Sequence, residues 1–139
     1  MKRTAVSLCI AACALLALAP AASARRVALR SATAVLPAVD PTGKLRKRDR
    51  VVRVNARSAK DAKIEVFLQA FCFNRKLKLL RKTKTFKGTG YVTGKVRKPR
   101  RKGFTCSTSA SVKVTSRPTP PQGDVPPIRL SAALYATRR

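Results

Sequence analysis

The stretch FTCSTSASVKV, residues 104–114, alternates strictly between two kinds of side chain. One set is apolar or small and comprises Phe104, Cys106, Thr108, Ala110, Val112 and Val114. The other set is mainly short and polar and comprises Thr105, Ser107, Ser109, Ser111 and Lys113. A period of two residues matches a β-strand with one buried face and does not match the 3.6-residue period of a helix. We therefore expect a half-buried strand here, with Cys106 directed toward the core.

Two further stretches show apolar alternation, and the second of them fits two periods. Residues 51–57 place Val52, Val54 and Ala56 on one face, which predicts a strand. In residues 63–73, KIEVFLQAFCF, one face at period two comprises Ile64, Val66, Leu68, Ala70 and Cys72. A helix capped by Ser58 and Asp61 also fits this stretch, with an apolar stripe of Ile64, Phe67, Leu68 and Phe71. The Val, Ile and Phe content favours the strand, and the helix stays the alternative.

The rest of the pattern predicts three more short strands. Residues 76–86 and 89–96, KLKLLRKTKTF and TGYVTGKV, form two successive strands around a glycine-containing turn. Residues 117–127 contain five prolines and are expected to form a loop, because proline cannot donate to a sheet's hydrogen-bond ladder. A last strand follows, with an apolar face of Ile128, Leu130, Ala132 and Leu134. Six short strands predict an all-β fold, a small antiparallel β-sandwich over residues 51–137.

The first 24 residues carry the three parts of a secretory signal peptide. Lys2 and Arg3 form the basic start, residues 5–19 are the apolar stretch, and the small-residue cleavage site is Ala22-Ser23-Ala24. We expect cleavage after Ala24 and a secreted or cell-envelope protein. Two alternatives are an uncleaved anchor, whose apolar run is shorter than the roughly 17 to 25 residues of a spanning helix, and lipidation of Cys13.

Removal of the leader leaves two cysteines, Cys72 and Cys106. In an exported chain two cysteines indicate one disulfide, and two buried free thiols are the alternative. The chain has no histidine and no third cysteine after the leader, so a tetrahedral metal site lacks ligands. We expect a disulfide, no metal and no cofactor.

The predicted architecture resembles an immunoglobulin-type sandwich, through two cysteines on separate core strands within residues 51–137. Phe104 stands two residues before the second cysteine, where the family has the tyrosine of its tyrosine corner, and the chain has no tryptophan. The resemblance implies a disulfide that joins the two sheets. It implies nothing about activity, because one fold supports many functions.

Positive charge is the most unusual property of the composition. The chain carries 32 Lys and Arg against 5 Asp and Glu, a net charge of +27, which falls to +25 when Lys2 and Arg3 leave with the leader. Residues 25–50 contain part of this charge without a sustained apolar period, so we predict a flexible basic arm. Between the cysteines, residues 74–105 contain thirteen cations and no acid. This imbalance predicts a polyanionic partner.

The densest run of charge, KVRKPRRK, is interrupted by Pro99 and ended by Gly103, which places it at a connection between strands. Arginine pairs with phosphate and carboxylate groups in bidentate fashion. The predicted polyanion-binding residues are Lys95, Arg97, Lys98, Arg100, Arg101 and Lys102, with Arg75, Lys76 and Lys78. The other basic residues of the segment from Arg75 to Lys87 are expected to help. A solvated loop that only keeps the protein soluble is the alternative.

Among function classes, catalysis has little basis in this sequence. The commonest general base, histidine, is absent, carboxylates are few and scattered, and no glycine-rich phosphate loop occurs. We expect a non-enzymatic protein that binds anionic polymers or surfaces without reading nucleic-acid sequence. Two alternatives are a secreted structural domain without a ligand and a cationic membrane-active protein. The second would use residues 74–82, NRKLKLLRK, as an interfacial helix in peripheral contact with a bilayer.

Overall fold

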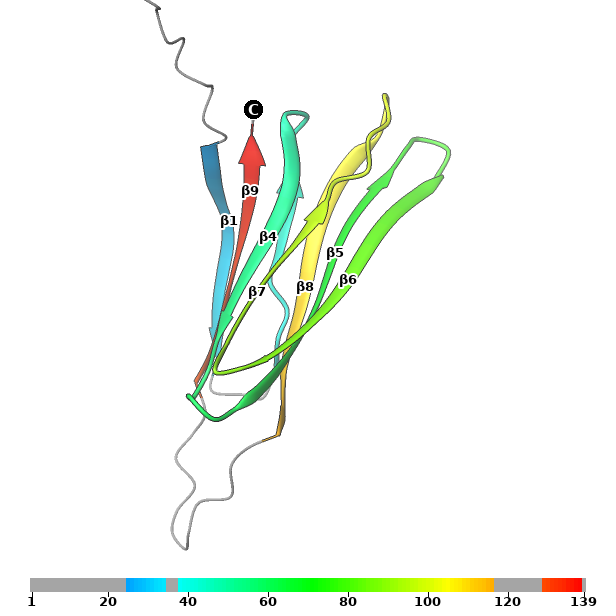
Figure 1. The fold of residues 1–139 in the computed structure, drawn as a ribbon. Helices are drawn as coiled ribbons and strands as arrows, with labels where there is room; N and C mark the ends of the chain where they lie inside the picture. The colour runs from blue at the N-terminus through cyan, green and yellow to red at the C-terminus, as the bar shows by residue number, and fades with distance from the viewer. Residues whose placement is uncertain (1–24, 35–37, 117–128, 139) are drawn as a thin grey trace, which may run out of the picture.

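The computed structural model describes residues 25–34, 38–116 and 129–138, and these form nine strands and no helix (Figure 1). In chain order the strands are β1 Arg25–Ala34, β2 Ala38–Val39, β3 Thr42–Leu45, β4 Asp49–Arg57, β5 Lys63–Phe73, β6 Leu79–Thr89, β7 Tyr91–Arg97, β8 Thr105–Ser116 and β9 Leu130–Arg138. Accordingly, the described part of the chain holds no helix with the length and apolar character needed to span a bilayer.

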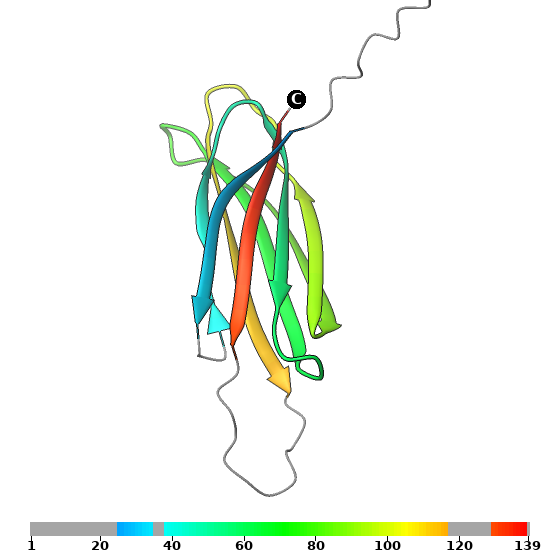
Figure 2. The same ribbon diagram turned by 90° about the vertical axis from the view of Figure 1, so that its left-hand side faces the viewer.

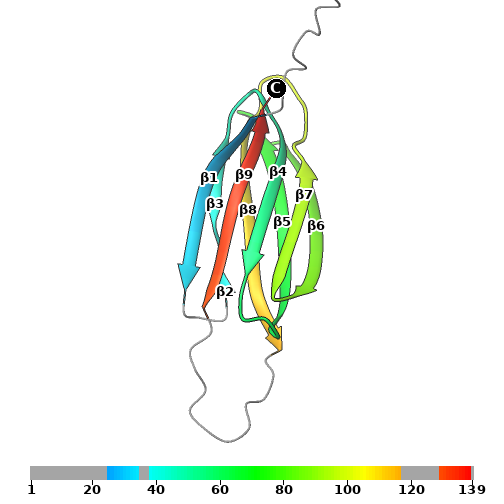
Figure 3. The ribbon, with the colours of Figure 1, turned by 60° about the vertical axis from the view of Figure 1, so that its left-hand side comes forward.

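The strands form two antiparallel sheets that pack face to face. One sheet has the order β1-β9-β4-β7, and the other has the order β2-β8-β5-β6, with β3 also paired to β8. Figure 2 shows the four-stranded sheet in front, and Figure 3 shows β6 and β7 as neighbouring edge strands of the two layers. The predicted all-β sandwich is thus confirmed at the level of two antiparallel sheets.

The core lies between the sheets and is built from every second residue along the strands, whose side chains point inward. All three apolar residues of the predicted 51–57 face are buried, as are Cys106, Thr108, Ala110 and Val112 of the strand around the second cysteine. In β9 the buried set is Leu130, Ala132, Leu134 and Ala136. The ambiguous residues 63–73 form strand β5, whose buried face is Ile64, Val66, Leu68, Ala70 and Cys72. The period-two interpretation is confirmed there, and the helical alternative is wrong.

The predicted disulfide forms between Cys72 and Cys106, but it lies within one sheet. Cys72 on β5 stands directly opposite Cys106 on its neighbour β8, and the two strands pair along their whole length. The expected bridge between sheets is therefore wrong, and this hallmark of the immunoglobulin-type resemblance is missing. The physical reason is that two cysteines that both point into the core can meet whether their strands are neighbours in one sheet or belong to the two facing sheets.

Residues 25–50 do not form the predicted flexible arm where the structure describes them. They contain β1, β2, β3 and the first residues of β4, and β1 pairs with β9 over nearly all of its length. A register shift between Ala28 and Arg30 breaks the alternation of β1, and β2 and β3 are too short to show a period. The sandwich therefore includes the described residues from Arg25 onward. The predicted leader, residues 1–24, and the proline-rich loop, residues 117–127, lie outside the described residues.

Candidate polyanion-binding cleft

Strands β6 and β7 are edge strands of different sheets, joined by a tight turn at Gly90. Gly90 has φ +71°, and its amide donates to the Ala62 carbonyl at 2.9 Å. Near this turn the sheets are in close contact, because a Cβ at Gly94 on β7 would lie 2.4 Å from the Phe86 ring on β6. From the turn the two strands diverge toward the other end of the sandwich (Figure 1). The two strands form a V, and Phe86 packs against Gly94 near its closed end.

Because β6 and β7 diverge, some side chains on the inner face of β6 are exposed to solvent. Leu80, Lys82 and Lys84 stand opposite Cys72, Ala70 and Leu68 of β5, all of which are buried. Cross-strand partners share a face of the sheet, so the two lysines project from the inner face of β6. They are nevertheless exposed to solvent. This geometry lets the ammonium groups of an edge strand face the opposite sheet edge.

Two adjoining hollows of about 930 and 600 Å³ lie between β6 and the outward positions of β4, β7 and β9, and share four lining residues, Val51, Lys82, Arg97 and Thr137. Cations contribute most of the walls. We call these nine residues the basic cleft: Arg50, Arg53, Lys82, Lys84, Lys95, Arg97, Lys98, Arg100 and Arg101. Among the described residues, no acid lines either hollow.

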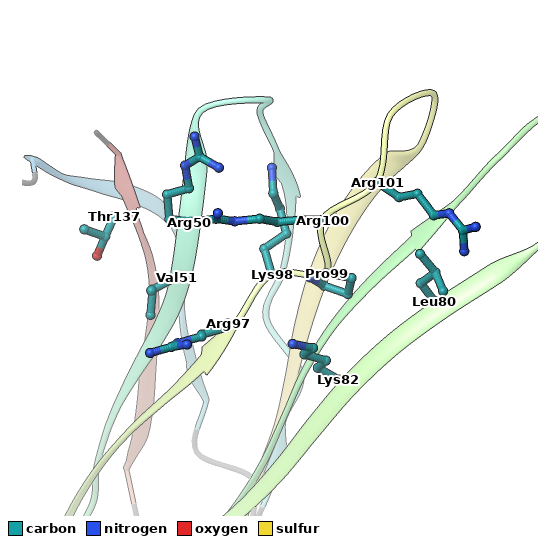
Figure 4. A pocket seen from close by; sticks show the side chains of 10 residues that line it. All are labelled: Arg50, Val51, Leu80, Lys82, Arg97, Lys98, Pro99, Arg100, Arg101 and Thr137. Atoms are coloured by element: carbon teal, nitrogen blue, oxygen red, sulfur yellow. The ribbon is translucent and has the colours of Figure 1, made fainter.

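The side chains of the larger hollow approach it from several elements (Figure 4). Arg97 reaches across β4 toward Val51, and Arg100 points toward Arg50. Lys82 faces the gap from β6, while Arg101 is directed toward Leu80. Positive charge therefore comes from both sheet edges and from the loop between β7 and β8.

Lys98 differs from the other cations of the basic cleft because its ammonium group is already bound. Its Nζ donates to the carbonyl oxygens of Arg46 at 2.8 Å and Lys47 at 3.1 Å, and so fixes the connection between β3 and β4. Burial lowers the pKa of Lys98, an effect that nearby Asp49 opposes and that Arg50 and Arg100 reinforce. Lys98 is thus a structural residue that holds the wall of the cleft.

The acid nearest to this wall, Asp49, is neutralised inside the fold. Its side chain is fully buried, and its Oδ1 accepts from Arg138 Nε at 2.6 Å while its Oδ2 accepts from the Arg46 amide at 2.7 Å. Glu65, on β5, lies 3.8 Å from Lys87 Nζ and 4.0 Å from Lys113 Nζ. Asp40 and Asp61 are exposed and line neither hollow. The basic cleft therefore keeps its charge without an acidic counterpart among the described residues.

The structure divides the predicted polyanion-binding residues into two groups. Lys95, Arg97, Lys98, Arg100 and Arg101 belong to the basic cleft. Arg75, Lys76 and Lys102 line a separate hollow of about 700 Å³ beside the turn between β5 and β6, and Lys78 is exposed in that turn. Lys82 and Lys84 belong to the segment from Arg75 to Lys87, whose basic residues were expected to help in binding. The sequence interpretation did not assign Arg50 and Arg53 to the site.

Comparison of the chain with protein-family models, curated proteins and solved structures found no match. The chemistry of the basic cleft therefore follows from its own residues. Guanidinium and ammonium groups gathered around adjoining hollows can bind phosphate, sulfate or carboxylate groups along an extended chain.

Proposed function

We propose that this chain is an exported, non-enzymatic protein that binds polyanions of the cell envelope or extracellular space through the basic cleft. The observation that carries this proposal is the convergence of nine cations, from β4, β6, β7 and the following loop, on two adjoining hollows. The charges are distant in sequence, from Arg50 to Arg101, and the fold brings them together. A merely soluble surface needs no such convergence.

The two adjoining hollows of the basic cleft favour an extended ligand. Lys84 and Lys95 line the smaller hollow. Cations from β4, β6 and β7 line this hollow, so an extended chain of anionic groups can contact several of them at once.

Export is supported by two features of different kinds. The leader pattern of residues 1–24 is typical of secretion. The Cys72–Cys106 disulfide, whose cysteines are buried, is compatible with an extracellular protein, because disulfides persist in oxidising compartments. Outside the cytoplasm, polyanions include envelope polymers, acidic polysaccharides and released nucleic acid.

The salt dependence of binding tests this proposal. Duplex DNA serves as a model polyanion, for which the logarithm of affinity falls with the logarithm of salt by about 0.9 per phosphate neutralised. Replacement of Lys95, Arg97, Arg100 and Arg101 together by serine should reduce that slope by about 3.6. The melting temperature should change little, because exposed charges contribute little to stability.

A matched control removes the same number of charges elsewhere. Arg30, Lys44, Lys60 and Lys63 are all exposed and line neither hollow of the basic cleft. Their replacement by serine should leave the slope close to the native value. Equal slopes for the two quadruple variants would contradict the proposal, because binding would then depend on net charge and not on the cleft.

A further inference from the structure

The turn between β5 and β6 holds a leucine in a backbone conformation that leucine rarely adopts. The turn is closed by hydrogen bonds from the Leu77 amide to the Asn74 carbonyl, at 3.0 Å, and from the Lys78 amide to Asn74 Oδ1, at 2.9 Å. Leu77 has φ +58°, and it is the one residue other than glycine with a positive φ in the described part of the chain. Glycine or asparagine is usual at such a position, since the Cβ of other residues is crowded there. Backbone geometry therefore does not explain the leucine.

Burial in the core does not explain the presence of leucine at position 77 either. The Leu77 side chain is 83% exposed, more than the other large apolar residues of the described chain. Leu79 at 56% and Phe73 at 40% exposed flank it on the strands that enter and leave the turn. Phe73 and Leu79 are cross-strand partners. The three side chains form an apolar group at the tip of a hairpin, which projects at one end of the sandwich (Figures 1 and 2).

Cations surround this apolar group. Arg75, Lys76 and Lys102 line the hollow of about 700 Å³ beside the turn, together with Phe73 and Phe104. Lys78 is exposed within the turn itself. Among the described residues, no acid lines this hollow. We call the group Phe73, Arg75, Lys76, Leu77, Lys78, Leu79 and Lys102 the hairpin tip.

We infer that the hairpin tip is a second binding site, which docks the protein on an anionic lipid bilayer. Binding to a bilayer surface grows with the apolar area that is buried and with electrostatic attraction to anionic lipids, and this tip combines exposed apolar side chains with basic ones. Leu77 would enter the boundary between headgroups and acyl chains, while Arg75, Lys76 and Lys102 would bind lipid phosphates around the hollow. This contact uses a hairpin, whereas the membrane-active alternative assigned an interfacial helix to residues 74–82, which in the structure form a turn and the start of β6. It does not depend on the basic cleft.

Fluorescence provides a direct test, because the chain contains no tryptophan. In the purified Leu77→Trp variant, vesicles of phosphatidylserine and phosphatidylcholine should shift the emission to shorter wavelength, and vesicles of phosphatidylcholine alone should not. A Lys60→Trp variant places the reporter in the turn before β5, at the opposite end of that strand, and should show no shift. The same shift from both reporters, or no shift from Leu77→Trp, would overturn the inference.

Two further variants separate the tip from the fold and from the basic cleft. Leu77→Gly relieves the backbone, so the melting temperature should stay equal or rise, while affinity for the anionic vesicles should fall about tenfold. Replacement of Arg75 and Lys76 by serine should lower that affinity by roughly 25-fold, since each cation near an anionic surface contributes about fivefold. Native vesicle affinity in Leu77→Gly would refute the insertion of the leucine.

The basic cleft and a soluble headgroup provide the remaining controls. The quadruple cleft variant should keep the Leu77→Trp shift on anionic vesicles, so failure of the cleft proposal and failure of the tip inference give different results. Soluble glycerophosphoserine should not reproduce the shift. If it does so at concentrations matched to the lipid, the tip binds an ion or headgroup alone, and membrane docking is wrong.

Discussion

Loss of the Cys72–Cys106 disulfide is expected to destabilise this protein mainly through its unfolded state. The cysteines are separated by 34 residues in the sequence. In the chain-entropy model a cross-link over such a loop contributes about 3.8 kcal/mol at 25 °C. Because the two cysteines are direct partners in a ladder that continues on both sides, their replacement by alanine should leave the pairing of β5 with β8 intact. Both side chains are buried, so the lost packing adds roughly 1 kcal/mol.

Urea unfolding of the native protein and of the Cys72→Ala, Cys106→Ala variant, followed by circular dichroism, measures this effect. We expect the same sheet spectrum without urea, a lower midpoint and a larger m value, because the uncross-linked unfolded chain exposes more surface. The total loss, about 4 to 5 kcal/mol, is a large share of the 5 to 15 kcal/mol typical of a domain. A loss below about 1 kcal/mol would refute the loop-closure reasoning.

Three other replacements test separate parts of the sandwich by urea unfolding. Asp49→Ala removes the buried partner of Arg138 and should cost about 3 to 5 kcal/mol; a change under about 1 kcal/mol would show that this ion pair is unimportant. Gly94→Ala places a Cβ against the Phe86 ring and should cost about 1 to 3 kcal/mol, and an unchanged midpoint would contradict that close approach. Because burial lowers the pKa of Lys98, the folded state loses this proton at a lower pH than the unfolded state does. The free energy of unfolding should therefore rise as pH approaches 10.5, and Lys98→Met should flatten that rise. An unaltered pH profile in the variant would contradict the lowered pKa of Lys98.

The central strands could be predicted because their inward positions alternate without interruption. Val52, Val54 and Ala56 of β4 are all buried, and every second residue from Ile64 to Cys72 of β5 is buried as well. The first strand could not be predicted, since the register shift between Ala28 and Arg30 places apolar residues out of phase. A bulge of this kind is fixed by pairing with β9, which lies at the far end of the sequence.

The disulfide partners could be predicted, but their sheet could not. The two-residue period indicates that Cys72 and Cys106 both point into the core. Two inward cysteines can lie on strands of two facing sheets or on neighbouring strands of one sheet. Which arrangement occurs depends on strand order, here β8 beside β5. Strand order is a property of the whole packing and has no local signature in the residues around each cysteine.

The candidate cleft shows the same limit at the level of side chains. The run from Lys95 to Arg101 stood out as charge alone, and the structure places it on one wall of the basic cleft. Lys82 and Lys84 were expected only to help, as part of a longer basic segment, and they occupy inward positions where an apolar residue is expected. They become part of a charged surface only because β6 and β7 diverge, and that divergence depends on the packing of two sheets.

Lysines on β6 and β7 also have a structural consequence that is compatible with anion binding. Within the described residues, β6 pairs only with β5, and β7 pairs only with β4, so each has one unpaired edge. Charged side chains on such edges prevent pairing with other chains. This protection needs only exposed charge. Among the described residues, however, the buried Asp49 pairs with Arg138 and Glu65 lies beside two lysines, so no acid lines the basic cleft. An external anion bound in the cleft would therefore reduce the repulsion among its cations, next to the unpaired strand edges. Anion binding thus explains why these cations are clustered, which solubility alone does not.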